Sequence, residues 1–153
     1  MRQAGIRTTT EAGLLLPLRD EDSEPFWAGT LKGELRMQRC IQCGRLRFPP
    51  RPMCPWCRSM ESDWPVMSGR GAIWSFVMPH PPLLPAYTEL APYNVIVVAL
   101  DEDPTLRLVG NLVALDDGPI NEVDPATIGI GETVRVVFQR IDDNTALPRW
   151  VRA

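Results

Sequence analysis

The sequence predicts a mostly β protein, in which a short N-terminal helix and a metal-binding ribbon precede a five-stranded barrel of the OB type. All four cysteines occur in two C-x-x-C pairs between Cys40 and Cys57. Five strand-like segments follow residue 64, and turn residues separate them. The 153 residues include 16 prolines and 11 glycines, a composition that favours turns over long helices. A small β-sandwich is the structural alternative to the barrel.

The chain divides into three parts by composition. Residues 1–22 are polar or weakly apolar and have no convincing period, so we expect a tail or a loosely attached arm. Residues 23–66 contain the predicted helix and ribbon, and residues 67–153 the barrel. The apolar runs are much shorter than the ~20 residues of a membrane helix, and an acidic segment follows the first of them, which disfavours a signal peptide. We therefore expect a cytosolic protein without a membrane-spanning segment.

A short helix is predicted to begin after Ser23, a residue type that caps helix N-termini. Glu24 and Pro25 suit its first turn, and Gly33 can end it. One face of this helix would carry Phe26, Trp27, Thr30 and Leu31.

The next segment, "ELRMQRC" at 34–40, alternates with a period of two and predicts a strand that leads into the first cysteine pair. Leu35 and Met37 lie on one side of this strand. Arg36 and Gln38 lie on the other.

The two C-x-x-C pairs predict a structural zinc site held by Cys40, Cys43, Cys54 and Cys57. A reducing cytosol disfavours disulfides, and the four prolines within residues 49–55 disfavour the helix that a thioredoxin-type redox pair needs. Two such turns let four thiolates converge on one ion as a closed tetrahedral site. Iron in place of zinc, disulfides and free thiols remain the alternatives.

Charge is distributed unevenly along the chain, although the formal net charge is only −3. Lys32–Arg58 holds seven basic residues and one acidic residue, whereas the part from Gly71 onward has a net charge of −6. The basic residues could offset the net charge of about −2 on a zinc–tetrathiolate centre. They could equally bind the phosphates of coenzyme A or of a nucleic acid, and the candidate contacts are then Arg45, Arg47 and Arg51.

The pattern after residue 64 is all-β. An irregular connection at 116–131 precedes the fourth predicted strand. The five segments are 72–78, 93–100, 106–115, 132–141 and 147–151. In the fourth segment, Val134, Val136 and Phe138 point to one side, and Arg135 and Gln139 face outward.

The chain offers few groups for catalysis. With the four thiols engaged and a closed metal site, neither a nucleophile nor an open metal position is left, and His80 is the one histidine. We expect no activity from the chain alone. The loop at 79–92 is apolar yet rich in proline, so it either caps the barrel or forms part of an interface. Candidate contacts with a partner or its substrate are Phe26, Trp27, His80, Leu83, Leu84 and Tyr87.

Six ordered stretches carry a resemblance to a known family: "PFWAGTLKGEL", "QRCIQCG", "PPRPMCPWC", "SGRGAIWSF", "APYNVIVVALDE" and "IGETVRVVF". Together they cover about residues 24–150. The sequence resembles the acyl-CoA-associated family with a rubredoxin-like zinc ribbon fused to an OB fold, first catalogued as a domain of unknown function. The resemblance implies an accessory role beside thiolase-like enzymes or acyl-CoA hydratases, including lyases that shorten steroid side chains.

Two hypotheses for function follow. The first is a non-catalytic subunit of an acyl-CoA-processing complex, whose zinc ribbon and helix dock a thiolase-fold aldolase, lyase or thiolase. The second is a nucleic-acid module, since zinc ribbons and OB folds both serve that purpose. The net negative charge of the barrel half disfavours the second, because a single-strand groove is basic.

Overall fold

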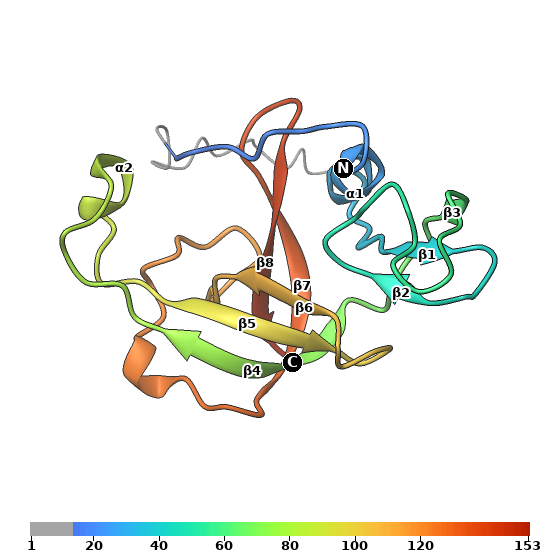
Figure 1. Cartoon of the computed structure of the whole chain (residues 1–153). Coiled ribbons are helices and arrows are strands. Elements are labelled where there is room, and N and C mark those ends of the chain that lie inside the picture. Colours follow the sequence, from blue (N-terminus) through green and yellow to red (C-terminus); the bar gives the residue numbers. More distant parts are fainter. Residues whose placement is uncertain (1–13) are drawn as a thin grey trace, which may run out of the picture.

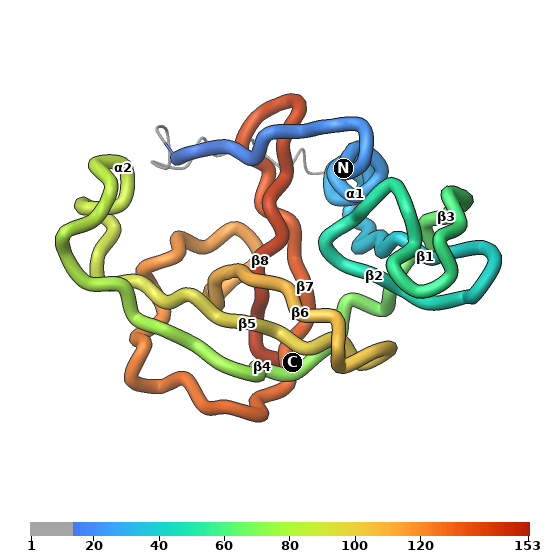
Figure 2. Tube along the Cα trace, in the orientation of Figure 1, coloured from blue at the N-terminus to red at the C-terminus, as the bar shows by residue number. Residues whose placement is uncertain are grey.

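The computed structural model describes residues 14–153, so most of the tail predicted at 1–22 lies outside the described residues. Two antiparallel sheets form the fold, a small one in the ribbon and a larger one in the barrel (Figure 1). The ribbon and the short helix α2 lie at opposite ends of the molecule (Figure 2). Within the described residues, no helix has the length and apolar character needed to cross a membrane.

Helix α1 spans Glu24–Leu31, as predicted, and Ser23 occupies its N-cap position. The Ser23 hydroxyl bonds to Asp20 instead of capping a helix amide. The buried face differs slightly from the predicted one: Trp27 and Leu31 are half-buried, and the fully buried residues are Phe26, Gly29 and Thr30.

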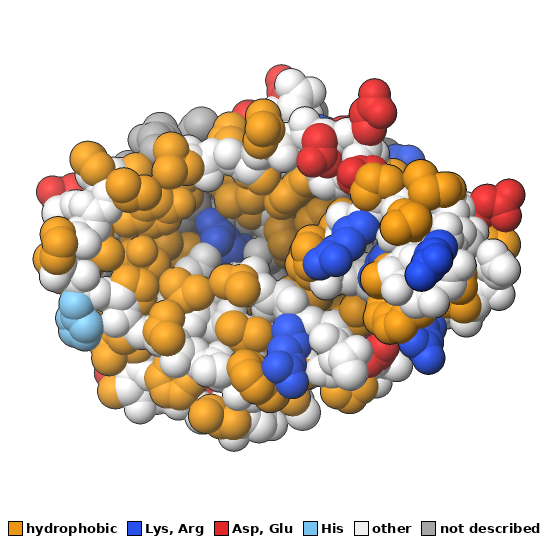
Figure 3. All heavy atoms as spheres, in the orientation of Figure 1, with side chains coloured by type: hydrophobic (Ala, Val, Ile, Leu, Met, Phe, Trp, Pro, Cys, Tyr) orange, Lys and Arg blue, Asp and Glu red, His pale blue; other side chains and the backbone are white. Residues whose placement is uncertain are grey.

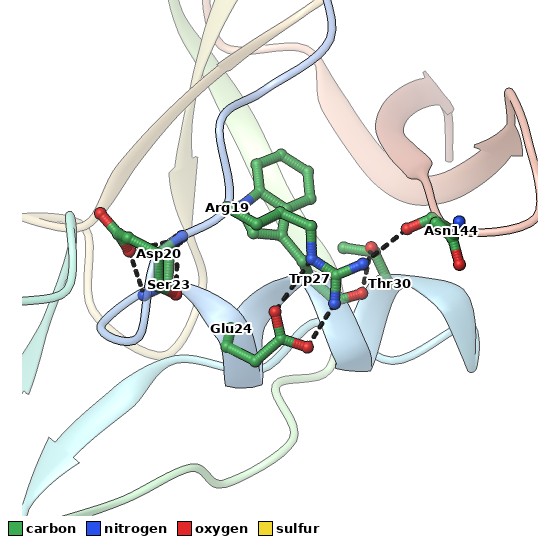
Figure 4. A network of polar contacts seen from close by, with 7 residues as sticks. All are labelled: Arg19, Asp20, Ser23, Glu24, Trp27, Thr30 and Asn144. Carbon is green, nitrogen blue, oxygen red and sulfur yellow. Dashed lines mark hydrogen bonds and ion pairs between the residues drawn. The ribbon is translucent and has the colours of Figure 1, made fainter.

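The segment before α1 is attached to the barrel through Arg19 (Figure 4). Its Nη1 donates to the carbonyl of Asn144, 2.6 Å away, in the loop between the last two strands. Its Nε donates to Glu24 Oε2 at 2.9 Å. One guanidinium therefore links the N-terminal arm, α1 and the barrel.

The ribbon sheet consists of β1 (Gln38–Cys40), β2 (Leu46–Arg47) and β3 (Ser62–Asp63) in the order β2-β1-β3. Leu35 and Met37, just before β1, are buried as predicted. Gln38 belongs to the opposite side of this strand, and it is only 5% exposed because Arg47 Nε donates a hydrogen bond to its Oε1.

The barrel sheet has the order β6-β5-β4-β7-β8, with all neighbouring strands antiparallel. Beyond the end of β6, Leu112 forms a parallel bridge with Trp150, and this contact joins the two edges of the sheet. The closure makes a five-stranded barrel of the OB type and excludes the β-sandwich. The strands are β4 (Arg70–Val77), β5 (Val95–Leu100), β6 (Arg107–Gly110), β7 (Thr133–Arg140) and β8 (Ala146–Arg152).

One hydrophobic core serves the helix, the ribbon strand and the barrel. Phe26 and Met37 belong to the same buried cluster as Ile96 and Trp150 of the barrel. The predicted inward side of β7 is confirmed: Val134 belongs to this cluster, and Val136 and Phe138 pack against it.

A second cluster covers the other side of β7 and β8. It contains Tyr93 and Val137, and Tyr87 of α2 (Pro85–Thr88) packs against it. This layer explains why Gln139, predicted to face outward, is 3% exposed: it faces away from the main core but not toward water. The connection at 116–131 is irregular as predicted, apart from the 3₁₀ turn η1 (Pro125–Thr127).

Candidate functional site

The four cysteines converge at the tip of the ribbon. The sulfurs of Cys40 and Cys57 are 3.5 Å apart and those of Cys43 and Cys54 3.6 Å, and all four lie within 4.8 Å of one another. Tetrahedral ligands about 2.3 Å from a zinc ion are roughly 3.8 Å apart, whereas a disulfide needs about 2.05 Å. The four thiols therefore fit a single zinc ion, as predicted, and not two disulfides.

Each cysteine pair sits in the same type of turn. The amide of Gly44 donates to the carbonyl of Cys40, and the amide of Arg58 donates to that of Cys54, both at 2.9 Å. The residue after each pair has a left-handed backbone, with φ +73° at Gly44 and 64° at Arg58. The repeated turn orients backbone amides toward the sulfurs of both pairs.

The turns set the acidity of the thiols in the metal-free protein. Burial raises the pKa of Cys54, but the backbone amides of Cys57 and Trp56 outweigh it and lower the pKa to about 6. At Cys57 the amide of Ser59 favours the thiolate, yet burial and the neighbouring thiols raise the pKa to about 11. A bound cation replaces the thiol protons, so its binding depends on pH.

The structure separates the three arginines that sequence reasoning proposed as phosphate contacts. Arg45 is exposed, and its guanidinium carbon lies 5.2 Å from the centre of the Trp56 ring. Arg51 is also exposed. Arg47 is only 3% exposed, so it lies inside the ribbon and not on its surface, contrary to the expectation of a direct contact.

The residues proposed as partner contacts differ in their exposure to solvent. Phe26 is 4% exposed and belongs to the core, which corrects its assignment as an anchor. Trp27 and Tyr87 line one cavity of about 390 Å³, visible in Figure 3 as a hollow with hydrophobic side chains around it. Leu83 packs against the second hydrophobic cluster, whereas Leu84 and His80 are exposed.

Sequence reasoning missed a buried polar network beside that hollow. Arg149 of β8 is 7% exposed; its Nη1 donates to Asn111 Oδ1 and its Nε to Gln139 Oε1, the latter at 3.0 Å. Asn111 in turn donates to the carbonyl of Asn94. Isolated polar residues beside apolar strand segments were the available signal, but their burial depends on the second hydrophobic cluster.

The outer face of β4, β5 and β6 is apolar, a second feature that was missed. Antiparallel sheets usually turn polar side chains toward water. Here Val97 pairs with Val109 and Ala72 with Ala99, and the side chains of both pairs point outward. We call this the outer sheet face; its apolar members are Ala72, Trp74, Val77, Val97, Ala99 and Val109, and it also carries Ser75 and two arginines, Arg70 at one end of β4 and Arg107.

One of the two arginines on this face stacks on an aromatic ring, although it stays exposed. The guanidinium carbon of Arg107 lies 3.7 Å from the centre of the Trp74 ring, which a register shift between Ile73 and Ser75 turns outward. Trp74 remains 51% exposed and Val109 67%. A large apolar surface of this kind marks an interaction site in a water-exposed protein.

A four-thiolate ribbon that shares one core with an OB barrel defines the class: a zinc-ribbon–OB-fold protein. Family models agree on both parts, "ChsH2, rubredoxin-like zinc ribbon domain" over residues 27–61 and "ChsH2, C-terminal OB-fold domain" over residues 64–139. The chain belongs to this ChsH2 family, also described as DUF35. The predicted family, fold class and structural zinc are confirmed.

Two curated relatives illustrate the range of the family. The 3-oxo-4,17-pregnadiene-20-carboxyl-CoA hydratase alpha subunit of Mycobacterium tuberculosis is 34% identical over 125 residues, which are 82% of this chain and 36% of that protein. The chain thus spans about a third of that relative. A DUF35 domain-containing scaffold protein of Methanothermobacter thermautotrophicus is 33% identical, over 67% of this chain and 70% of its own length.

Solved structures support the same assignment. A chain of the Ltp2-ChsH2(DUF35) aldolase has a TM-score of 0.76 and 32% identity, covering 90% of this chain and 98% of its own. A DUF35 protein of unknown function from Sulfolobus solfataricus has a TM-score of 0.56 and 12% identity, and it supports the fold alone.

Proposed function

We propose that this chain is a non-catalytic accessory subunit that pairs with a thiolase-fold aldolase, lyase or thiolase acting on acyl-CoA. The observation that carries the proposal is the apolar outer sheet face. Members of the family support it, since one is a chain of the Ltp2-ChsH2(DUF35) aldolase and another is named as a scaffold protein. The relative named for a pregnadiene-carboxyl-CoA makes steroid side-chain degradation the proposed setting.

Docking would use the outer sheet face, together with the hollow beside α2. Val109 belongs to both, since it points out of β6 and also lines the hollow with Trp27 and Tyr87. Leu84 of the α2 segment is 58% exposed and extends the apolar area. A stable pairing buries roughly 1,200–2,000 Å² in total and needs buried aromatic anchors, which Trp74 and Tyr87 could supply.

The proposal includes the basic surface of the ribbon as a contact for the phosphates of coenzyme A. Arg45 and Arg51 are exposed there, and the ion pairs of the ribbon engage other arginines, Arg36 with Glu34 and Arg39 with Asp63. A nucleic-acid role is less well supported, because the chain from Gly71 onward has a net charge of −6, whereas a groove for single strands is basic.

We also propose that the protein is cytosolic. Its two domains in this proposal are the helix with the zinc ribbon, residues 23–66, and the OB-fold domain, residues 67–153. Zinc–thiolate sites persist in a reducing compartment, where thiols are not oxidised to disulfides. The chain alone should not turn over acyl-CoA, and His80→Ala should leave the fold intact because His80 is exposed.

Co-expression with a thiolase-like protein from the same genome tests the pairing. We expect a complex that co-purifies and is active, while the partner alone is inactive or insoluble. Val109→Glu should abolish co-purification, because it places a charge in the apolar face. Met60→Glu is the control, since Met60 is 64% exposed but lies in the ribbon and not in the barrel sheet. Separate elution of the two proteins at micromolar concentration, with a fully active partner, would refute the proposal.

A further inference from the structure

A cavity of about 310 Å³ lies where the ribbon meets the barrel. Its ribbon side comes from β2, the loop after it and the second cysteine turn, through Arg47, Arg51 and Trp56. Its barrel side is the β5–β6 turn, through Thr105 and Leu106. Two modules thus form one partly enclosed site.

The wall of this cavity contains a buried positive charge. Arg47 Nε donates to Gln38 Oε1 at 2.7 Å, and Nη2 donates to the carbonyl of Arg51 at 3.1 Å. Nη1 is buried and has no hydrogen-bond partner within residues 14–153. No ion pair of Arg47 occurs in this part of the chain either. Two neutral oxygens hold the guanidinium in place without neutralising it.

A buried charge of this kind is costly unless an anion compensates it. The residues that line the cavity include no carboxylate. The acid beside them in sequence, Asp103, already accepts bonds from the amide and hydroxyl of Thr105 at 2.9 and 2.7 Å. The exposed guanidinium of Arg51 adds a second positive charge at the cavity. The site is therefore cationic, with apolar walls that strengthen its field.

The aromatic side chain of Trp56 completes the site. It lines the cavity, is 51% exposed and carries Arg45 over its ring. An aromatic surface beside two guanidinium groups suits a phosphate that is attached to a flat ring system.

We propose that this cavity binds a phosphate group, with Arg51 in direct contact and the buried charge of Arg47 stabilising the anion. Trp56 packs against the base when the phosphate belongs to a nucleotide. The inference rests on the proposed phosphate contact of the ribbon and gives that contact a defined place. It does not depend on pairing, because every residue of the site belongs to this chain.

Titration calorimetry on the isolated, zinc-loaded chain tests the site. The probes are inorganic phosphate, adenosine 3′,5′-bisphosphate and adenosine. We expect the bisphosphate to bind and adenosine not to bind. Binding of inorganic phosphate as well would identify a general small-anion site; binding of the bisphosphate alone would identify a nucleotide phosphate. Failure of both phosphate probes would overturn the inference and leave the accessory-subunit proposal standing.

Variants assign the contact. Arg51→Gln should weaken bisphosphate binding about tenfold or more, the effect of losing one charge-assisted hydrogen bond. Arg70→Gln removes an exposed arginine of β4 away from the cavity and should leave binding unchanged. Trp56→Ala should weaken binding of the bisphosphate but not of inorganic phosphate.

A zinc assay tests the alternative that Arg47 only offsets the negative charge of the zinc–thiolate site. Arg47→Met keeps the side-chain volume and removes the charge; we expect it to retain zinc and lose phosphate binding. If it instead loses zinc while Arg51→Gln binds phosphate normally, Arg47 only offsets the thiolate charge, and the proposal is wrong.

Discussion

A single buried side-chain amide, that of Asn94, joins two strands of the barrel where their backbone pairing stops. Asn94 is fully buried next to the first residue of β5. Its Nδ2 donates to the carbonyl of Leu112 at 2.9 Å, and its Oδ1 accepts from the amide of Leu112 at 2.7 Å. One side chain thus replaces two ladder bonds beyond the end of β6.

Asn94→Ala should therefore destabilise the barrel by roughly 2–4 kcal/mol, because it leaves a buried amide and a buried carbonyl unsatisfied. Urea unfolding followed by tryptophan fluorescence measures this change. Asn121→Ala, at an exposed position, is the control and should change stability by less than about 0.5 kcal/mol. Equal effects of the two substitutions would contradict the assigned role of Asn94.

Cys54 is the buried thiol whose pKa the backbone amides of its turn lower to about 6 in the metal-free ribbon. Cys54→Ser should abolish zinc binding and unfold the ribbon tip, since closed zinc sites contribute about 10–16 kcal/mol of apparent binding energy. Most of the β-sheet signal should remain, because the barrel has its own core residues. Elemental analysis and circular dichroism measure both effects; full zinc content in the variant would disprove the four-thiolate site.

Among the elements, β4 shows how one strand can serve two surfaces. Its first half pairs with both β5 and β7, and the register shift near Trp74 turns that ring outward. Gly71 lets the strands approach closely: a Cβ there would lie 2.7 Å from Val98 Cγ1 and closer still to the carbonyl of Ala99.

Gly71→Ala should accordingly cost about 1–3 kcal/mol through overpacking of the β4–β5 pair. Thermal unfolding measures the loss. Gly129→Ala is a suitable control, because its new Cβ would meet only the end of the flexible Glu132 side chain at 3.2 Å. Equal melting temperatures for the two variants would show that the strands can separate without cost.

For the whole molecule, the shared core joins ribbon, helix and barrel, whereas only the ribbon tip depends on metal. Phe26 and Met37 pack in one cluster with barrel residues, and none of the four cysteines belongs to that cluster. Loss of the ion should consequently change the tip without opening the hollow beside α2.

Acid should release the zinc, because each thiolate must take up a proton when the ion leaves. The ion stabilises the deprotonated form, so its contribution is present at neutral pH and is lost as pH falls. Release should therefore occur on the acid side of neutral pH and not on the alkaline side. A zinc-sensitive dye during a pH titration measures the release; zinc that stays bound in acid, or is released as the pH rises from 7, would contradict this sign.

The sequence by itself determined the features that depend on local spacing. Two C-x-x-C turns fix where four thiols point, since each turn spans four residues and needs no distant partner. Alternation likewise predicted all five barrel strands, with errors mainly at the ends, as where β6 stops at Gly110.

Only the tertiary structure decided what covers each face. Periodicity correctly assigned Gln38 and Gln139 to the face opposite the main core, yet both are buried, under Arg47 and under the second hydrophobic cluster. Conversely, the apolar outer residues of β5 remain partly accessible. The physical reason is that a period of two tells which side of a strand a residue occupies. Whether another layer, a partner or water lies on that side depends on contacts between residues far apart in the sequence.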